Sequence, residues 1–139
     1  MFLFVKGPGL KHSIMKTEKT IDMKVRLSTL WILVMFNMVF ADIFSIIVEL
    51  VNRNTLAIPG DVKTVMAIAA VVTNIPVLMI YFSRTLPYKK NRPVNIIAAL
   101  LTIVYVIGGG DPAPHYIILA LVETALLIAV IVYALKWKQ

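Results

Sequence analysis

The chain has 139 residues, of which 60% are hydrophobic and 15% are charged. A soluble domain of this length cannot bury so many apolar side chains, because a small globule keeps a large surface relative to its core. The formal net charge of +7 does not indicate a nucleic-acid-binding protein, because the basic residues lie almost entirely between the apolar runs and form no basic helix face.

The residue types that hold metals and redox cofactors are scarce. There is no cysteine, which excludes disulfides, thiolate metal sites and thiol redox chemistry. The two histidines, His12 and His115, are too few and too far apart for a multi-histidine zinc site or a bis-histidine haem. We therefore expect no metal, no cofactor and no catalytic residues.

Residues 1–26 form a polar, basic leader. The run Gly7-Pro8-Gly9 is expected to break any helix, and a short surface helix over Ile14 to Val25 is only weakly indicated. Met15 and Met23 could serve as alternative starts, so we expect part of the leader to be dispensable.

Four apolar segments follow and predict an all-α, polytopic membrane protein, a bundle of four transmembrane helices over 27–139. Each is close to the roughly 20 residues that cross a bilayer core. Ser28 is expected to cap the first span, Pro93 to lie in the first turn of the third, and Trp31 and Trp137 to anchor the protein at the membrane surface. The predicted spans are 27–51, 65–82, 94–107 and 114–135, of which the third is the shortest and could extend through the glycines that follow it.

Basic residues predict the orientation. The leader, the break between the second and third spans, and the C-terminal tail together carry twelve of them, whereas the other side carries only Arg53 and Lys63. The positive-inside rule therefore places both termini in the cytoplasm, and we expect the protein in the plasma membrane.

Polar side chains recur inside all four spans, where ionisable groups are costly and are functional candidates by default. Asp42, Ser45 and Glu49 share one face of the first span. We expect a polar layer at the bilayer midplane that binds a proton, a cation or a small polar solute, and in which Asp42 and Glu123 cannot both stay ionised. The alternative is that these groups only hydrogen-bond neighbouring helices, with Asn74 satisfying Asp42. The candidates for this layer are Asn37, Asp42, Ser45, Asn74, Thr102 and Glu123.

Two further groups lie nearer the membrane surfaces. Glu49 and His115 are near the outer ends of the first and fourth spans and could pair there. A basic loop could bind anionic lipid headgroups through Arg84, Lys89, Lys90 and Arg92.

The chain carries the motifs Leu27-Ser28-Thr29-Leu30-Trp31-Ile32, Met35-Phe36-Asn37, Ala41-Asp42, Ile75-Pro76, Ser83-Arg84, Asn91-Arg92, Asn95-Ile96-Ile97-Ala98, Glu123 and Tyr133-Ala134-Leu135-Lys136-Trp137. These motifs are similar to those of an uncharacterised family of small four-helix bacterial and archaeal membrane proteins, known as a domain of unknown function. The resemblance covers about Met23 to Trp137 and implies a four-helix membrane fold but no activity. In that family an acid often precedes the Ile-Pro pair, where this chain has Asn74. The resemblance marks Asn37, Asp42, Arg84, Asn95 and Glu123 as motif positions.

Three hypotheses of function follow. The first is a proton- or cation-linked transporter or solute-binding protein that uses Asp42 and Glu123, as a homo-oligomer because four short helices enclose little volume. The second is a non-transporting accessory or lipid-binding protein. The third, a membrane enzyme, is disfavoured because no nucleophile with a base, metal cluster or cofactor motif accompanies the carboxylates.

Overall fold

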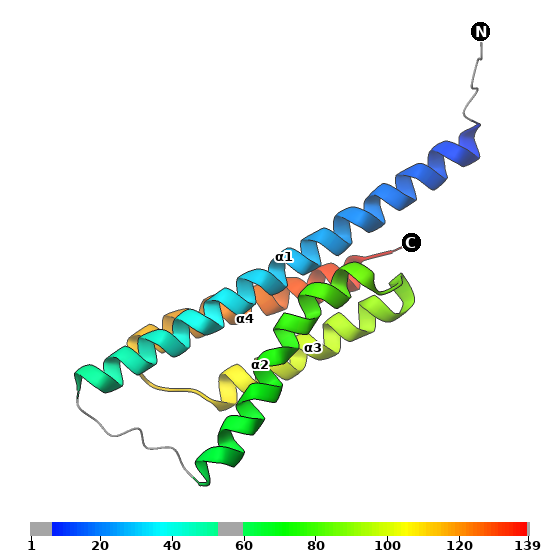
Figure 1. Cartoon of the computed structure of the whole chain (residues 1–139). Helices are drawn as coiled ribbons and strands as arrows, with labels where there is room; N and C mark the ends of the chain where they lie inside the picture. Colours follow the sequence, from blue (N-terminus) through cyan, green and yellow to red (C-terminus); the bar gives the residue numbers. More distant parts are fainter. Residues whose placement is uncertain (1–6, 53–59, 139) are drawn as a thin grey trace.

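The computed structural model describes residues 7–52 and 60–138, and within them the chain forms four α-helices (Figure 1). All four are long and apolar enough to cross a membrane. The prediction of an all-α membrane protein with four spans is therefore confirmed. The helices are α1 (Pro8–Val51), α2 (Val62–Thr85), α3 (Tyr88–Gly108) and α4 (Pro114–Lys136).

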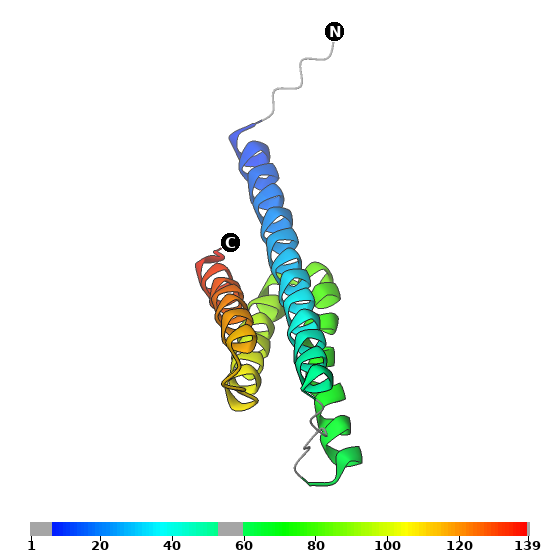
Figure 2. The ribbon, with the colours of Figure 1, turned by 90° about the vertical axis from the view of Figure 1, so that its left-hand side faces the viewer.

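The first helix is far longer than the first predicted span, because the basic leader is helical and continuous with it. Pro8 stands at the start of α1, where its missing N–H costs nothing. Ser28 is therefore not a cap: it lies inside the helix, fully buried, and its hydroxyl donates to the carbonyl of Ile80 in α2 at 2.9 Å. Figure 2 shows the N-terminal part of α1 extending past the other three helices.

The second helix begins with a side-chain cap. Asp61 accepts hydrogen bonds through Oδ2 from the hydroxyl of Thr64 at 2.8 Å and from its backbone N–H at 3.1 Å. These bonds favour the ionised carboxylate, so the Thr64 hydroxyl first, and then its backbone N–H, lower the pKa of Asp61.

Replacing Asp61 by asparagine is expected to leave stability nearly unchanged at pH 7 and to remove part of its loss in acid. A carboxyl whose pKa is lowered in the folded state contributes stability above its unfolded pKa, and this contribution disappears as pH falls through the folded pKa. The effect is confined to the region below about pH 4. Hydrogen exchange of the first turn of α2, followed from neutral to acidic pH in both proteins, checks it; parallel pH profiles would contradict it.

The turn between α2 and α3 is tighter than expected. Leu86 and Pro87 adopt extended backbone angles, and α3 begins directly afterwards at Tyr88. The short third span is therefore lengthened at its N-terminal end, and Pro93 lies inside the helix instead of in its first turn. The other end stops at Gly108, the first of the three glycines, so the helix does not extend through the glycine run.

The four helices form a ring in which α1 packs against α2 and α4, and α3 packs against α4 and α2. The fully buried residues of α2 are Pro76, Met79 and Ser83, all in its second half. Figure 1 shows the first half of α2 diverging from α3. The bundle is therefore tightest at the end that carries the basic α2–α3 turn.

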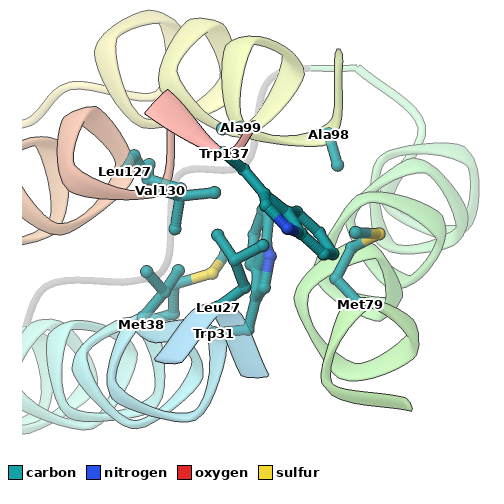
Figure 3. Close-up of a cluster of buried hydrophobic side chains, with 10 residues drawn as sticks. Leu27, Trp31, Met38, Met79, Ala98, Ala99, Leu127, Val130 and Trp137 are labelled. Carbon is teal, nitrogen blue, oxygen red and sulfur yellow. The ribbon is translucent and has the colours of Figure 1, made fainter. Parts of the chain in front are cut away.

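Both tryptophans belong to the core at this end (Figure 3). Trp31 and Trp137 have no exposed surface, and the ring of Trp137 meets that of Tyr88 edge-on at 5.1 Å. Their expected role as anchors in the membrane surface is therefore wrong. Their positions near the ends of spans suggested an interfacial role, but the rotation of α1 and the turn after α4 direct both rings inward.

We expect tryptophan emission to be shielded both from acrylamide in water and from brominated lipids, because protein surrounds both indoles. The measurement is quenching of the reconstituted protein. A Leu33→Trp variant is the control, since Leu33 is exposed on the same helix and an indole there should be quenched by the lipid. Strong lipid quenching of the unmodified protein would show that the rings face the bilayer.

Candidate intramembrane site

Glu123, near the middle of α4, is the only acidic residue that is fully buried among those the structure describes. Its side chain is 3% exposed. The amide of Asn37 in α1 donates to Glu123 Oε2 at 3.3 Å and to the carbonyl of Leu119 at 2.8 Å. The other carboxyl oxygen, Oε1, has no hydrogen-bond partner within the described part of the chain. Glu123 is therefore held between α1 and α4 by one long contact, with half of its carboxyl group unsatisfied.

This geometry suits a group that binds and releases a proton. An ionised carboxylate in a water-poor interior is costly unless several donors surround it, and the described residues supply one. A proton on Oε1 would cancel the charge and provide a donor. Thr102, also fully buried, does not serve the carboxyl, because its hydroxyl donates to the carbonyl of Ala98 in its own helix at 2.8 Å.

Asp42 does not join Glu123 in one layer. Its side chain is exposed at the edge of a cleft between α1 and α2 with a volume of about 300 Å³, which Asn74 also lines. The Asn74 amide donates to the carbonyl of Ala70, one turn earlier in α2, at 2.7 Å, and no described hydrogen bond joins it to Asp42. The other lining residues are Met35, Met38, Val39, Thr73 and Val77.

The expected midplane layer is thus divided between two places. Asn37 and Glu123 meet between α1 and α4, whereas Asp42 and Asn74 face the α1–α2 cleft. The reason is that α1 packs against both α2 and α4, so side chains a few residues apart face different neighbours.

The pair expected at the outer end also differs. Ser45 Oγ lies 3.3 Å from Nε2 of His115, which joins α1 to α4. Glu49, with which His115 was expected to pair, is half-buried, and no hydrogen bond or ion pair of the described residues includes it.

The basic turn is partly built into the fold. Arg84 donates through Nε to Ser28 Oγ at 3.0 Å, and Arg92 donates through Nη2 to the carbonyl of Leu135 at 3.2 Å. Lys89 and Lys90 remain exposed. Lys89 and Arg92 line a recess of about 370 Å³ on α3 together with Tyr88, Pro93 and Ile96.

Sequence reasoning missed a buried polar network behind this turn. Asn95 Oδ1 accepts from Trp31 Nε1 at 2.7 Å and from Ser83 Oγ at 3.0 Å. Asn95 Nδ2 donates to Asn91 Oδ1 and to its backbone carbonyl, and Asn91 in turn donates to the carbonyls of Ser83 and Leu86. The network connects α1, α2 and α3 through hydrogen bonds. The spacing of Asn91 and Asn95, one helical turn apart in an apolar segment, was the available signal.

One of three comparisons with known proteins confirms the expected resemblance to a family of unknown function. No curated protein and no solved structure matches the chain. One family model matches residues 15–139, which include all of α2, α3 and α4 and most of α1. The chain therefore belongs to a family of unknown function, DUF6326.

Proposed function

We propose that this chain is a multi-pass protein of the plasma membrane, with both termini in the cytoplasm, that binds or transports a small polar or cationic solute and couples this to a proton or cation at Glu123. The observation that carries the proposal is the buried carboxyl group of Glu123, whose Oε1 has no partner among the described residues. Intramembrane carboxyl groups of this kind are costly, and they are characteristic of ion and proton pathways.

The Asp42 cleft supports the solute-binding part of the proposal. A carboxylate, an amide and a hydroxyl lie beside methionine and valine side chains in a cleft of about 300 Å³. Such a lining suits a small cationic or polar solute with an apolar part. The distribution of basic residues supports the orientation, because the α2–α3 turn and both ends of the chain carry most of them.

The test requires no knowledge of the solute. A pH jump across proteoliposomes on a solid-supported membrane should give a transient current as protons enter Glu123. Glu123→Gln should abolish the current, whereas Glu49→Gln, a matched change in a half-buried acid of α1, should retain it. A current that persists undiminished in Glu123→Gln, or no current in the unmodified protein, would overturn the proposal.

A second candidate is a lipid-binding or accessory role, which the recess on α3 favours. Lys89 and Arg92 stand at its basic end, and Ile96 lies two turns beyond Lys89 and about one turn beyond Arg92, further into the membrane span. This arrangement fits an anionic phospholipid, with its headgroup at the basic residues and a chain along the helix.

Retention of phosphatidylglycerol in native mass spectrometry should fall in a Lys89→Gln/Arg92→Gln variant. The matched control is Lys19→Gln, which removes a basic residue of α1, a helix that contributes no residue to the recess. Equal retention in all three proteins would contradict the lipid site.

A further inference from the structure

The N-terminal half of α1 carries apolar side chains that no residue of the described ranges 7–52 and 60–138 covers. This part of the helix projects beyond the bundle (Figure 2), and its residues are mostly exposed. Leu10, Ile14, Ile21 and Val25 lie on one face of it, and Leu10 and Ile21 are 49% and 57% exposed. The same segment carries five lysine and arginine residues, which places it in water rather than in the bilayer.

The apolar face continues into the membrane with a regular spacing of eleven residues. Eleven residues are close to three turns at 3.6 residues per turn, so this spacing keeps side chains on one nearly straight line. Two such series run side by side along the helix, and we call them together the α1 stripe. The stripe consists of Leu10, Ile21, Ile32 and Ile43 and of Ile14, Val25, Phe36 and Ile47. All are exposed except Ile32, which is half-buried.

Lipid can cover the membrane part of the stripe but not the part in water. A lone helix in water is marginally stable, and this one contains the β-branched residues Thr17, Thr20 and Ile21. A soluble partner could cover only the projecting part. A partner that follows the whole stripe must itself be a helix that passes from water into the bilayer in the same orientation.

We propose that this partner is a second copy of the chain, with the two α1 helices packed in parallel through the α1 stripe. The positive-inside bias gives both copies the same orientation, as a parallel pair requires. Charges on the edges of the stripe fit the pairing. Glu18 flanks one edge and Lys24 the other, and a two-fold axis brings the Glu18 edge of each helix to the Lys24 edge of its partner. Asp22 and Lys11 lie on the same edge as Glu18, and Asp22 is paired within its own helix with Arg26 at 3.0 Å.

The pairing also completes the Asp42 cleft, and this part of the inference rests on the proposed function. Met35 and Val39, which line the cleft together with Asp42, border the stripe on the same side as Lys24, whereas Phe40 borders it on the side of Glu18. The two-fold axis therefore brings the partner's Phe40 to the open side of the cleft. In the single chain Phe40 is 50% exposed.

Disulfide crosslinking tests the interface directly, because the chain has no cysteine of its own. Ile21→Cys places a thiol on the stripe in the aqueous segment, and Ile43→Cys places one on the stripe in the membrane. Lys19→Cys is the matched control, since Lys19 lies on the opposite face of the same segment. In full-length protein in proteoliposomes, mild oxidation should convert both stripe variants to a species of twice the 15.5 kDa chain mass, and Lys19→Cys should stay monomeric while reacting fully with maleimide.

Equal crosslinking of Lys19→Cys and Ile21→Cys would overturn the proposal, as would a lack of crosslinking in both stripe variants. Crosslinking of Ile21→Cys without Ile43→Cys would also overturn it, because the pairing must continue into the membrane. A second measurement uses the chain without cysteine. Ile21→Asp should lower the dimer fraction found by mass photometry in nanodiscs, and Lys19→Asp should not. Neither readout depends on proton movement, so failure of the interface and failure of the Glu123 proposal are distinguishable.

Discussion

Replacing Asn95 by leucine is expected to lower the free energy of unfolding by about 2 to 3 kcal/mol, because leucine has a similar size but can make none of the hydrogen bonds of the amide. The Trp31 Nε1–H and the Ser83 hydroxyl would lose their acceptor, and the Asn91 side chain would lose its donor, all in positions without solvent exposure. The measurement is unfolding of the detergent-solubilised protein with increasing sodium dodecyl sulfate.

Asn74→Leu is the matched control for this change. Asn74 is also an asparagine inside a span, but it is exposed, and among the described residues its amide donates only to the carbonyl of Ala70 in its own helix. We expect the control to change the unfolding free energy by less than about 0.6 kcal/mol, the average found for membrane hydrogen bonds. Similar losses in both variants would show that the network adds nothing to the fold beyond local helix contacts.

Trp31→Phe separates the contributions within the network. The phenyl ring retains most of the buried apolar surface and removes only the indole N–H, so Asn95 keeps Ser83 as a donor. The loss should be smaller than for Asn95→Leu, at about 1 kcal/mol. A loss as large as that of Asn95→Leu would mean that packing of the ring, and not the polar network, dominates the stability of this region.

The number of helices could be predicted from the sequence because long apolar runs, and the charged breaks between them, can be recognised locally without knowing how the helices pack. The direction in which each side chain faces could not, because it depends on the rotation of each helix against its neighbours. Asp42 and Ser45 are three residues apart on α1, yet the first faces the α2 cleft and the second reaches His115 of α4. Spacing along one helix shows which side chains share a face. It does not show which neighbour each side chain meets, because α1 packs against both α2 and α4.

The bounds of the helices show a related limit. Hydropathy marks the part of a helix that suits the bilayer, whereas α1 and α3 continue beyond it through basic residues. Lysine and arginine are good helix formers, so charge ends a membrane span without ending the helix. The projecting part of α1 and its apolar stripe follow from this distinction.

The pH dependence of stability distinguishes a proton site at Glu123 from a structural hydrogen bond. Below about pH 4 the Glu123 carboxyl group is neutral in the folded and in the unfolded protein, so the stabilities of the unmodified protein and of Glu123→Gln should nearly coincide there. At about pH 8 the Glu123 carboxyl group of the unfolded chain is ionised in water. In the folded protein the same group must either keep its proton or carry a buried charge that only one long contact, to Asn37, stabilises. Either way its stability falls as pH rises, and Glu123→Gln should become the more stable protein.

Thermal unfolding of both proteins across this range, with Glu49→Gln as the control, measures the effect. Glu49 is half-buried near the outer end of its span, so its replacement should leave the pH profile unchanged. If Glu123→Gln is instead less stable at every pH, the carboxyl group acts as a hydrogen-bonding strut between α1 and α4. The proton-linked function would then lose its main support, and the lipid recess at Lys89 and Arg92 would become the better-founded site.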